Sequence, residues 1–548
     1  MKEIKNEKIL FFLGCCFFSL FIIFFVNPIG NFPLNDDWQY AYPVKTLIET
    51  GVYQLDSYFS PNIFLQVIWG YSFCLIPNEF SFTYLRFSTL FTAVICGLVF
   101  FQIIKSRTNR TFYECWVITF FLVFNPFFFS LSFSFMTDVP FLLLCLLSIS
   151  YYKRYLNEER LLFRILGIGF AIAALFVRQP GVLILISAEL SIIGFYFIDK
   201  KIEGVPLLKV LRNKNIAASV FTIFLSGLVY FFIENYLKFW LDGHEHYISV
   251  GGEYLKTLTE SPFLFIFQFS KRSLMTVFYS GFFCFPLIFV IIEKIKIYQL
   301  NQKWIFTVLF TLNILLSFLL LRSGYIFPFG GNIFYNLGLG PVLLKDIYVL
   351  NFPIGFEIPN YIFISLGLVC QILGCYIFLF LGKKLFHALQ EPLKNKFFLL
   401  LVMANVFYLG AMMIFSYFDR YLLLLFVSIL IVFFDEKPNK KIYKYPSFVI
   451  LTIAFSSFSV LATKDYLTWN RVSQSAYEKL ISKGIDEVNI DGGVPKNGFE
   501  GTLSEIENTH EYILTFNELE NYEVEESITF YRWLSLHEDH LLILKKVK

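Results

Sequence analysis

Residues 9–28 read ILFFLGCCFFSLFIIFFVNP, an apolar run long enough to cross a hydrocarbon core of roughly 30 Å as a helix. Comparable runs recur as far as Ala462. Of the 548 residues, 57% are hydrophobic, 20% are aromatic and only 16% are charged, and the mean hydropathy is +0.63. Soluble domains are far less apolar than this. The sequence therefore predicts an all-α polytopic membrane protein whose first run is a retained anchor, because no small-residue cleavage site follows it.

The apolar runs predict about thirteen transmembrane helices. We place them at 9–28, 81–104, 111–132, 138–156, 161–178, 180–198, 215–236, 273–293, 303–322, 360–381, 396–416, 420–435 and 446–462. If the N-terminus is cytoplasmic, the inner segments hold 25 Lys and Arg residues and the outer loops up to residue 463 hold nine. This distribution satisfies the positive-inside rule. It predicts a bacterial inner (plasma) membrane protein with a cytoplasmic N-terminus and an extracytoplasmic C-terminus.

One apolar stretch, residues 62–77, is left out of the spans. Counting it would invert every later loop and move most of the basic loops outside. We expect it to form a short juxtamembrane helix at the outer interface.

Two domains are expected, a transmembrane domain at 1–463 and a soluble extracytoplasmic domain at 464–548. The second holds 9 basic and 16 acidic residues, a net charge of −7, whereas the remainder of the chain carries +10. A helical stretch at 466–482 precedes β-type runs at 487–490, 512–516, 528–533 and 541–544. These patterns predict a small α/β fold. The nine cysteines all precede residue 376 and form neither a disulfide framework nor a zinc motif.

Most ionisable residues of the apolar region fall at the predicted outer ends of helices. They are Asp36, Asp37, Asp138, Arg178, Lys271, Arg272, Arg322, Asp419 and Arg420. Singly, each has a structural explanation: Asp138 can be a helix N-cap, an arginine can extend toward the interface, and the first aspartates can lie in a solvated loop. Together, adjacent carboxylates suit general-base chemistry and arginines suit a phosphate. Their coincidence favours a site.

The same residues resemble motifs of the GT-C superfamily of lipid-dependent glycosyltransferases, especially the protein O-mannosyltransferase and lipid A aminoarabinose transferase branch. Four motifs carry the resemblance over most of the chain: Asp36, Asp37, Tyr40 and Gly51 in the first loop; Thr137, Asp138 and Pro140; Arg178 and Gln179; and Arg420 and Tyr421. The resemblance implies a GT-C-like bundle with external juxtamembrane helices.

The resemblance also implies a reaction. The donor would be a polyprenyl-phosphate-linked sugar, such as a mannose-like hexose, and the acceptor a lipid, glycan or protein, with no nucleic acid involved. Asp36 would act as the base of an inverting displacement, with Asp37, Asp138 and Tyr40 beside it. The residues expected at the donor phosphate are Arg178, Gln179, Arg420 and Arg272.

A divalent metal (Mg, Mn or Zn) is a possible cofactor, with Asp36 and Asp138 as ligands. His244 and His246 are a weaker metal candidate, because histidines in a solvated loop are commoner than ligands.

Two other functions remain open. A lipid-linked sugar flippase or transporter is suggested by Glu189, which falls in the middle of a predicted span without an evident partner. A surface-polysaccharide polymerase would share the outward face and the sugar substrate. The glycine-rich stretches 330–333, 336–341 and 490–493 also resemble parts of uncharacterised bacterial members, without an assigned role.

Overall fold

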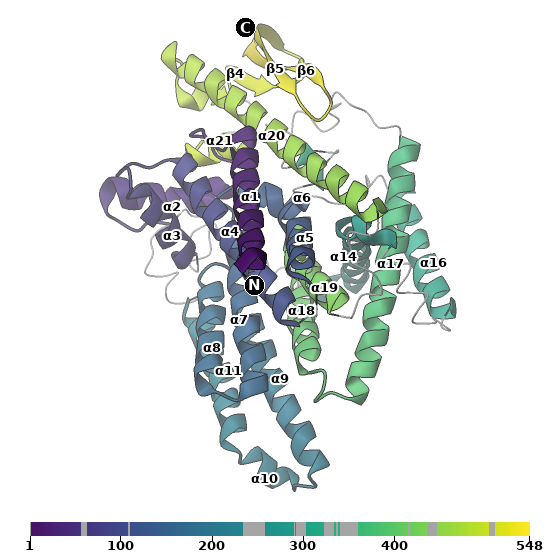
Figure 1. The fold of residues 1–548 in the computed structure, drawn as a ribbon. Helices are drawn as coiled ribbons and strands as arrows, with labels where there is room; N and C mark the ends of the chain where they lie inside the picture. Colours follow the sequence, from purple (N-terminus) through teal and green to yellow (C-terminus); the bar gives the residue numbers. More distant parts are fainter. Residues whose placement is uncertain are drawn as a thin grey trace.

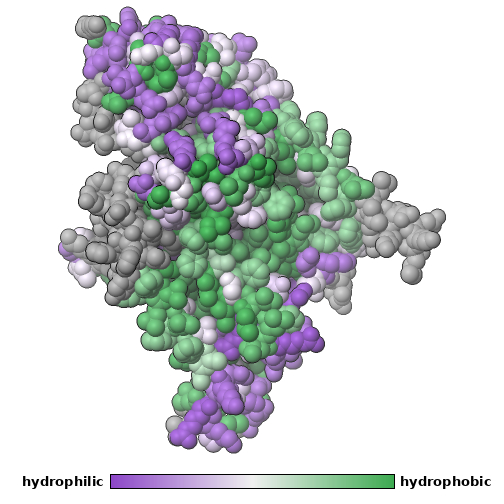
Figure 2. Space-filling model, turned by 90° about the vertical axis from the view of Figure 1, so that its left-hand side faces the viewer, coloured by the Kyte–Doolittle hydropathy of each residue, from purple (hydrophilic) through white to green (hydrophobic). Residues whose placement is uncertain are grey.

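The computed structural model describes residues 2–55, 63–107, 110–233, 258–289, 291, 303–322, 334–335, 338–339, 360–414, 417–435, 446–502 and 510–547. Helices make up most of the molecule, and a small sheet near the C-terminus lies at one end of it (Figure 1). Figure 2 shows a hydrophobic middle flanked by hydrophilic surface at both ends. This is the surface expected of a membrane protein, because lipid contacts the middle and water the ends.

The helices of the first half, up to residue 233, are α1 (Lys2–Val26), α2 (Asp37–Thr50), α3 (Phe64–Cys74), α4 (Phe82–Arg107), α5 (Phe112–Val123), α6 (Pro126–Ser132), α7 (Asp138–Glu158), α8 (Leu161–Leu175), α9 (Gly181–Ile202), α10 (Leu207–Leu211) and α11 (Lys214–Phe232). The second half contributes α14 (Pro262–Phe283), η2 (Phe285–Leu287), α16 (Lys303–Arg322), α17 (Asn360–Gln390), α18 (Lys396–Ile414), η3 (Asp419–Leu422), α19 (Leu423–Phe434), α20 (Pro446–Ser482), η5 (Glu487–Asn489) and α21 (Val494–Phe499).

Every predicted span overlaps one of these helices. Within the described ranges, six helices are long and apolar enough to cross a membrane, and a bent pair raises the number to seven. The six are α4, α9, α11, the Ser365–Gln390 part of α17, α18 and α20. The chain is therefore a multi-pass membrane protein, and the full number of thirteen spans stays a prediction.

The predicted span at 111–132 is broken rather than straight. Its two halves, α5 and α6, meet at an angle of 70°. The side chain of Asn125 accepts a hydrogen bond from the amide of Phe127 and caps α6, and Pro126 occupies the first turn. Because proline lacks an amide donor and asparagine is a strong N-cap, a new helix begins here. Within the stretch 62–77, residues Phe64–Cys74 form the short α3, which packs between α2 and α4.

Polar contacts join helix ends that the charge pattern assigned to the cytoplasmic side. Arg107 at the end of α4 forms a 2.5 Å ion pair with Asp435, which follows α19. The Lys384 ammonium of α17 lies 4.0 Å from the same carboxylate, and Lys153 of α7 donates to Ser106. These ends therefore lie together, as helix ends on one side of a membrane must.

α20 is a single helix of 37 residues that passes through the predicted domain boundary at 463/464 without a break. The predicted start of a separate helix at 466 is therefore wrong. The four-stranded sheet packs beside the last turns of α20, where Tyr477 and Leu480 share one hydrophobic cluster with Leu514 and Ile543. Asp465 fixes the sheet further by accepting hydrogen bonds from the amides of Trp533 and Leu534.

The sheet contains β3 (Ile490–Asp491), β4 (Tyr512–Thr515), β5 (Tyr522–Arg532) and β6 (His537–Lys546) in the order β3-β4-β6-β5. Only the β3–β4 pairing in this sheet is parallel. The predicted strands at 512–516, 528–533 and 541–544 are confirmed. The predicted run 487–490 is mostly the 3-10 helix η5. Two further strands, β1 (Phe334–Tyr335) and β2 (Gly338–Leu339), form a two-stranded ribbon.

Candidate functional site

The first ion pair of the site joins the residue before α2 to the short helix η3. Arg420 donates from Nη2 to Oδ2 of Asp36 over 2.9 Å. The Arg420 side chain is 5% exposed, whereas that of Asp36 is 39% exposed. Asp36 is the N-cap residue of α2, but its carboxylate makes no capping hydrogen bond. Its side chain is therefore directed to Arg420 and the surface rather than to its own helix.

The second ion pair joins the start of α7 to the connection between α8 and α9. Arg178 donates from Nη1 to Oδ1 of Asp138 over 2.5 Å, and their side chains are 14% and 3% exposed. The N-cap of α7 is Thr137, so the explanation of Asp138 as a helix N-cap is wrong. The other carboxylate oxygen, Oδ2, is buried and has no hydrogen-bond partner among the described residues. Such a buried acceptor is costly unless a ligand or water satisfies it.

The two ion pairs lie next to each other. The guanidinium groups of Arg178 and Arg420 lie 4.2 Å and 5.6 Å from the ring centroid of Tyr421. Arg420 interacts electrostatically with Asp138 as well as with Asp36. Tyr40, one turn into α2, interacts with both arginines. Residues from four distant parts of the chain therefore form one cluster of two carboxylates, two guanidinium groups and two phenols.

Asp37 points away from this cluster into the protein. It is fully buried and accepts hydrogen bonds from the amides of Leu34 and Phe135 over 2.6 Å and 3.1 Å. Burial raises the pKa of the Asp37 carboxyl to about 7, while the nearby charge of Arg86 and the two amide donors oppose the rise. The two adjacent aspartates thus have different environments, and Asp37 fixes the first loop to the segment before α7.

Arg86 on α4 is a site residue that the sequence reasoning missed. It is fully buried, and its guanidinium donates to the carbonyls of Pro28, Gly30 and Phe32, which precede the two aspartates. The ring of Phe32 also lies 4.2 Å from the guanidinium carbon. Arg86 therefore holds the chain that leads into Asp36. An arginine inside the apolar run 81–104 was the signal, because a charge at that depth requires a partner.

Two residues predicted to bind the phosphate, Arg272 and Gln179, form hydrogen bonds within the protein. Arg272 on α14 donates to the carbonyl of Met413 over 2.6 Å and lies near the phenol of Tyr417. Gln179 follows Arg178 directly, and its backbone carbonyl accepts from the amide of Val182. Their part in binding a phosphate stays a prediction.

Glu189 has a partner, contrary to the expectation from the sequence. Its carboxylate accepts two hydrogen bonds from Arg164, over 3.2 Å and 2.6 Å, and a third from the hydroxyl of Tyr152 over 2.9 Å. Arg164 also donates to Ser219 over 2.8 Å. This buried network connects α7, α8, α9 and α11 in the interior of the helix bundle.

The donor set does not fit the possible divalent metal. Asp36 and Asp138 are each neutralised by an arginine, and the described part of the chain contains no group of three or more His, Cys, Asp or Glu side chains able to hold a metal ion. Guanidinium groups at both carboxylates disfavour a cation there. His244, His246 and the stretch 330–333 lie outside the described residues, as does most of 336–341.

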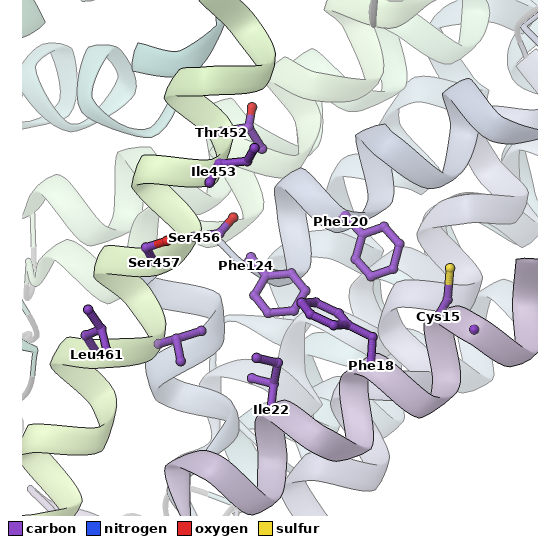
Figure 3. Close-up of a pocket in the computed structure, with 12 residues that line it drawn as sticks. Cys15, Phe18, Ile22, Phe120, Phe124, Thr452, Ile453, Ser456, Ser457 and Leu461 are labelled. Carbon is purple, nitrogen blue, oxygen red and sulfur yellow. The ribbon is translucent and has the colours of Figure 1, made fainter. Parts of the chain in front are cut away.

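An apolar groove of about 620 Å³ lies away from the cluster, between α1, α5 and α20. Figure 3 shows Phe18 of α1, Phe120 of α5 and Phe124, which follows α5, across from Thr452 and Ser456 of α20. Its lining carries no charged residue, so it lacks the groups that a phosphorylated sugar would need.

Comparisons with known proteins add little to this description. No protein-family model and no curated protein matches the sequence. A solved structure of the archaeal oligosaccharyltransferase AglB from Archaeoglobus fulgidus, in complex with an inhibitory peptide and a dolichol-phosphate, is similar to 80% of this chain at 12% identity and a TM-score of 0.36. The chain spans about half the length of that protein, since the match covers 52% of it. A likeness of this size identifies neither the fold nor the function.

Proposed function

We propose that this chain is a GT-C-type membrane glycosyltransferase that transfers a sugar, such as a mannose-like hexose, from a polyprenyl-phosphate donor to an acceptor on the outer face of the membrane. The supporting observation is the adjacency of the Asp36–Arg420 and Asp138–Arg178 pairs, which share the ring of Tyr421. The four motifs that resemble the superfamily supply these residues.

Asp36 is the base in this proposal because its carboxylate is half-exposed, whereas that of Asp37 is buried and bonded to two amides. The Asp36 carboxylate takes the proton of an acceptor hydroxyl. That oxygen attacks the anomeric carbon, and the bond from this carbon to the phosphate oxygen breaks. The lipid phosphate leaves with the electron pair, so one inverted glycosidic bond replaces one phosphoester bond.

Arg420 has two alternative anionic partners in this scheme. In the structure it pairs with Asp36, and a donor phosphate entering the cluster competes for the same guanidinium. Exchange of partners frees the Asp36 carboxylate for the acceptor proton and places positive charge where the phosphate develops negative charge. Arg178, held by Asp138, provides the second positive charge. Donor binding and activation of the base are thereby coupled.

Asp138 has two tasks. Its Oδ1 holds Arg178, and its unpartnered Oδ2 is available to accept a hydrogen bond from a substrate hydroxyl. A Asp138→Asn variant retains one acceptor oxygen but loses the charge that holds Arg178. We expect it to weaken donor binding as well as turnover.

The proposal is tested in membranes supplied with radiolabelled polyprenyl-phosphate mannose. Asp36→Asn should lower transfer by about 10²- to 10⁴-fold, the usual loss on removing a general base. Glu523→Gln, which alters an exposed carboxylate of β5, is the matched control and should retain transfer. Wild-type turnover in Asp36→Asn would exclude this base. The length of the product separates a transferase, which adds one sugar, from a polymerase, which yields a ladder.

A further inference from the structure

A cleft of about 530 Å³ lies between the first-loop helix and the C-terminal domain. One wall comes from α2, where Lys45 and Glu49 line it, and the segment 78–82 adds a second side. Gln474 of α20 and Lys496 of α21 line the side that belongs to the C-terminal domain. The volume is in the range of small-ligand sites in proteins.

Helix α2 lies between the cleft and the ion-pair cluster. Asp36 precedes Lys45 by nine residues, which corresponds to about 14 Å along the helix axis and places the two side chains on opposite sides of the helix. The indole ring of Trp38 packs on α21. A Cβ added to Gly498 of that helix would lie 2.5 Å from the ring. A ligand in the cleft would therefore have to pass the N-terminal end of α2 to reach Asp36.

The chemistry of the lining favours a ligand with many hydroxyls and no net charge. Two lysines and three glutamates line the cleft, so its formal charge is close to balance. The amides of Asn78 and Gln474 add donors and acceptors. The rings of Phe80 and Phe499 stack on each other with their centroids 5.7 Å apart, and the Lys45 ammonium lies 4.8 Å from the Phe499 centroid, so the two rings add apolar edges to a mainly polar lining. A polyanion would need an excess of basic residues, which the lining lacks.

The lining favours a glycan over a peptide. It comes from three helices and from segments 31–33 and 78–82, and no strand of the described structure is part of it. Peptides bound in extended form usually pair with an open strand edge, and helical peptides need an apolar groove. Most of the lining residues here are polar.

We propose that this cleft binds the sugar units of a neutral oligosaccharide acceptor whose terminal hydroxyl reaches Asp36. This inference rests on the proposed transferase function and narrows its acceptor to a glycan. The units next to the reacting hydroxyl would pass around the N-terminal end of α2 from Asp36 and continue to Lys45 and Glu49 in the cleft.

Binding can be measured apart from transfer. Full-length protein in lipid nanodiscs is tested by saturation-transfer NMR against mannotetraose, maltotetraose and chitotetraose, and against a pool of mixed octapeptides. At least one tetrasaccharide should receive saturation, and Asp36→Asn should bind it as the wild type does. Gln474→Phe and Glu49→Phe, which fill the cleft from opposite walls, should each weaken binding by about tenfold or more, a change of about 1.4 kcal/mol.

The outcomes separate the two proposals. Absence of binding to all three tetrasaccharides, unchanged binding in both filled variants, or binding of peptides alone would overturn the glycan site. Thermal unfolding of each variant checks that it is folded, and either variant suffices if the other is not. Retained transfer in Asp36→Asn would overturn the assignment of the base and leave the binding result intact.

Discussion

The buried pair of Arg164 and Glu189 allows a direct test of whether an ionised residue inside a span is structural. Their side chains are 4% and 0% exposed. Replacing Glu189 by Leu would leave the Arg164 guanidinium buried without a carboxylate, bonded to the neutral hydroxyl of Ser219. We therefore expect the free energy of unfolding to fall by about 3–5 kcal/mol. Replacing both residues by Leu removes the two charges together, and stability should return to within a few kcal/mol of the wild type. The hydroxyl of Tyr152 loses its acceptor in either variant, at a cost of about 1–3 kcal/mol.

The assay is equilibrium unfolding of the purified protein in mixed micelles, titrated with sodium dodecyl sulfate. A double-mutant cycle over the two single Leu variants and the double variant gives the coupling energy, which we expect to be at least about 3 kcal/mol, because each single variant leaves one buried charge without its partner. Glu189→Gln is then reconstituted in vesicles, and flux of a lipid-linked sugar or of protons is measured.

Additive effects of the two substitutions would refute the structural role of the pair. Flux that is present in the wild type and lost in a fully stable Glu189→Gln variant would favour the transporter hypothesis instead. Loss of stability together with no flux in the wild type would leave Glu189 as a structural residue of the bundle.

Three further predictions concern the first loop. Gly498→Ala should cost about 1–3 kcal/mol, because the added Cβ would collide with the ring of Trp38, whereas Gly410→Ala, with nothing within 4 Å of its Cβ, should be neutral or stabilising. Arg86→Met should lower the melting temperature and reduce transfer, because three carbonyls before Asp36 lose their donor. For Asp37, the pKa is raised by burial to about 7, so the folded state binds more protons than the unfolded state between about pH 4 and pH 7, and stability should fall as the pH rises through this range.

Each of these has its own check. Equal melting temperatures for the two glycine variants would contradict the tight contact. Rescue of transfer by Arg86→Lys to the wild-type rate would show that a single positive charge, rather than the bonded guanidinium, is sufficient. A pH profile of unfolding that is the same in Asp37→Asn and in the wild type would assign the pH dependence to another group.

The sequence predicts much of the helical architecture because the lengths of apolar runs are set by the thickness of the bilayer. It fails where local chemistry interrupts or extends a run. One predicted span is broken at Asn125, which caps α6. The resulting bend of 70° between α5 and α6 cannot be predicted from hydropathy. In α20, polar residues after 463 indicate water contact but not a helix end, since no glycine or proline occurs between 447 and 483.

For the site, the sequence identifies candidate residues from their positions at predicted outer helix ends: Asp36, Asp138, Arg178 and Arg420. It does not show which carboxylate forms an ion pair with which arginine. Asp36 and Arg420 are 384 residues apart, and their contact depends on where the fold places η3 relative to the start of α2. Arg86 and Arg164 lie inside apolar runs and were readable as charges in need of partners. Only the three-dimensional arrangement gives those partners, because they are carbonyls of the connection between α1 and α2 for Arg86 and a carboxylate of α9 for Arg164.

The uninterrupted α20 connects the membrane-embedded part of the protein to its water-exposed C-terminal sheet through a single helix. At 37 residues it is about 55 Å long, with Phe448 buried at one end and Tyr477 packed against the sheet at the other. Because the helix has no break, a tilt of one half changes the position of the other half. Any change in bilayer thickness that tilts the lipid-embedded half of α20 would therefore move Gln474 relative to Glu49, and the width of the proposed acceptor cleft would vary with the membrane around the protein.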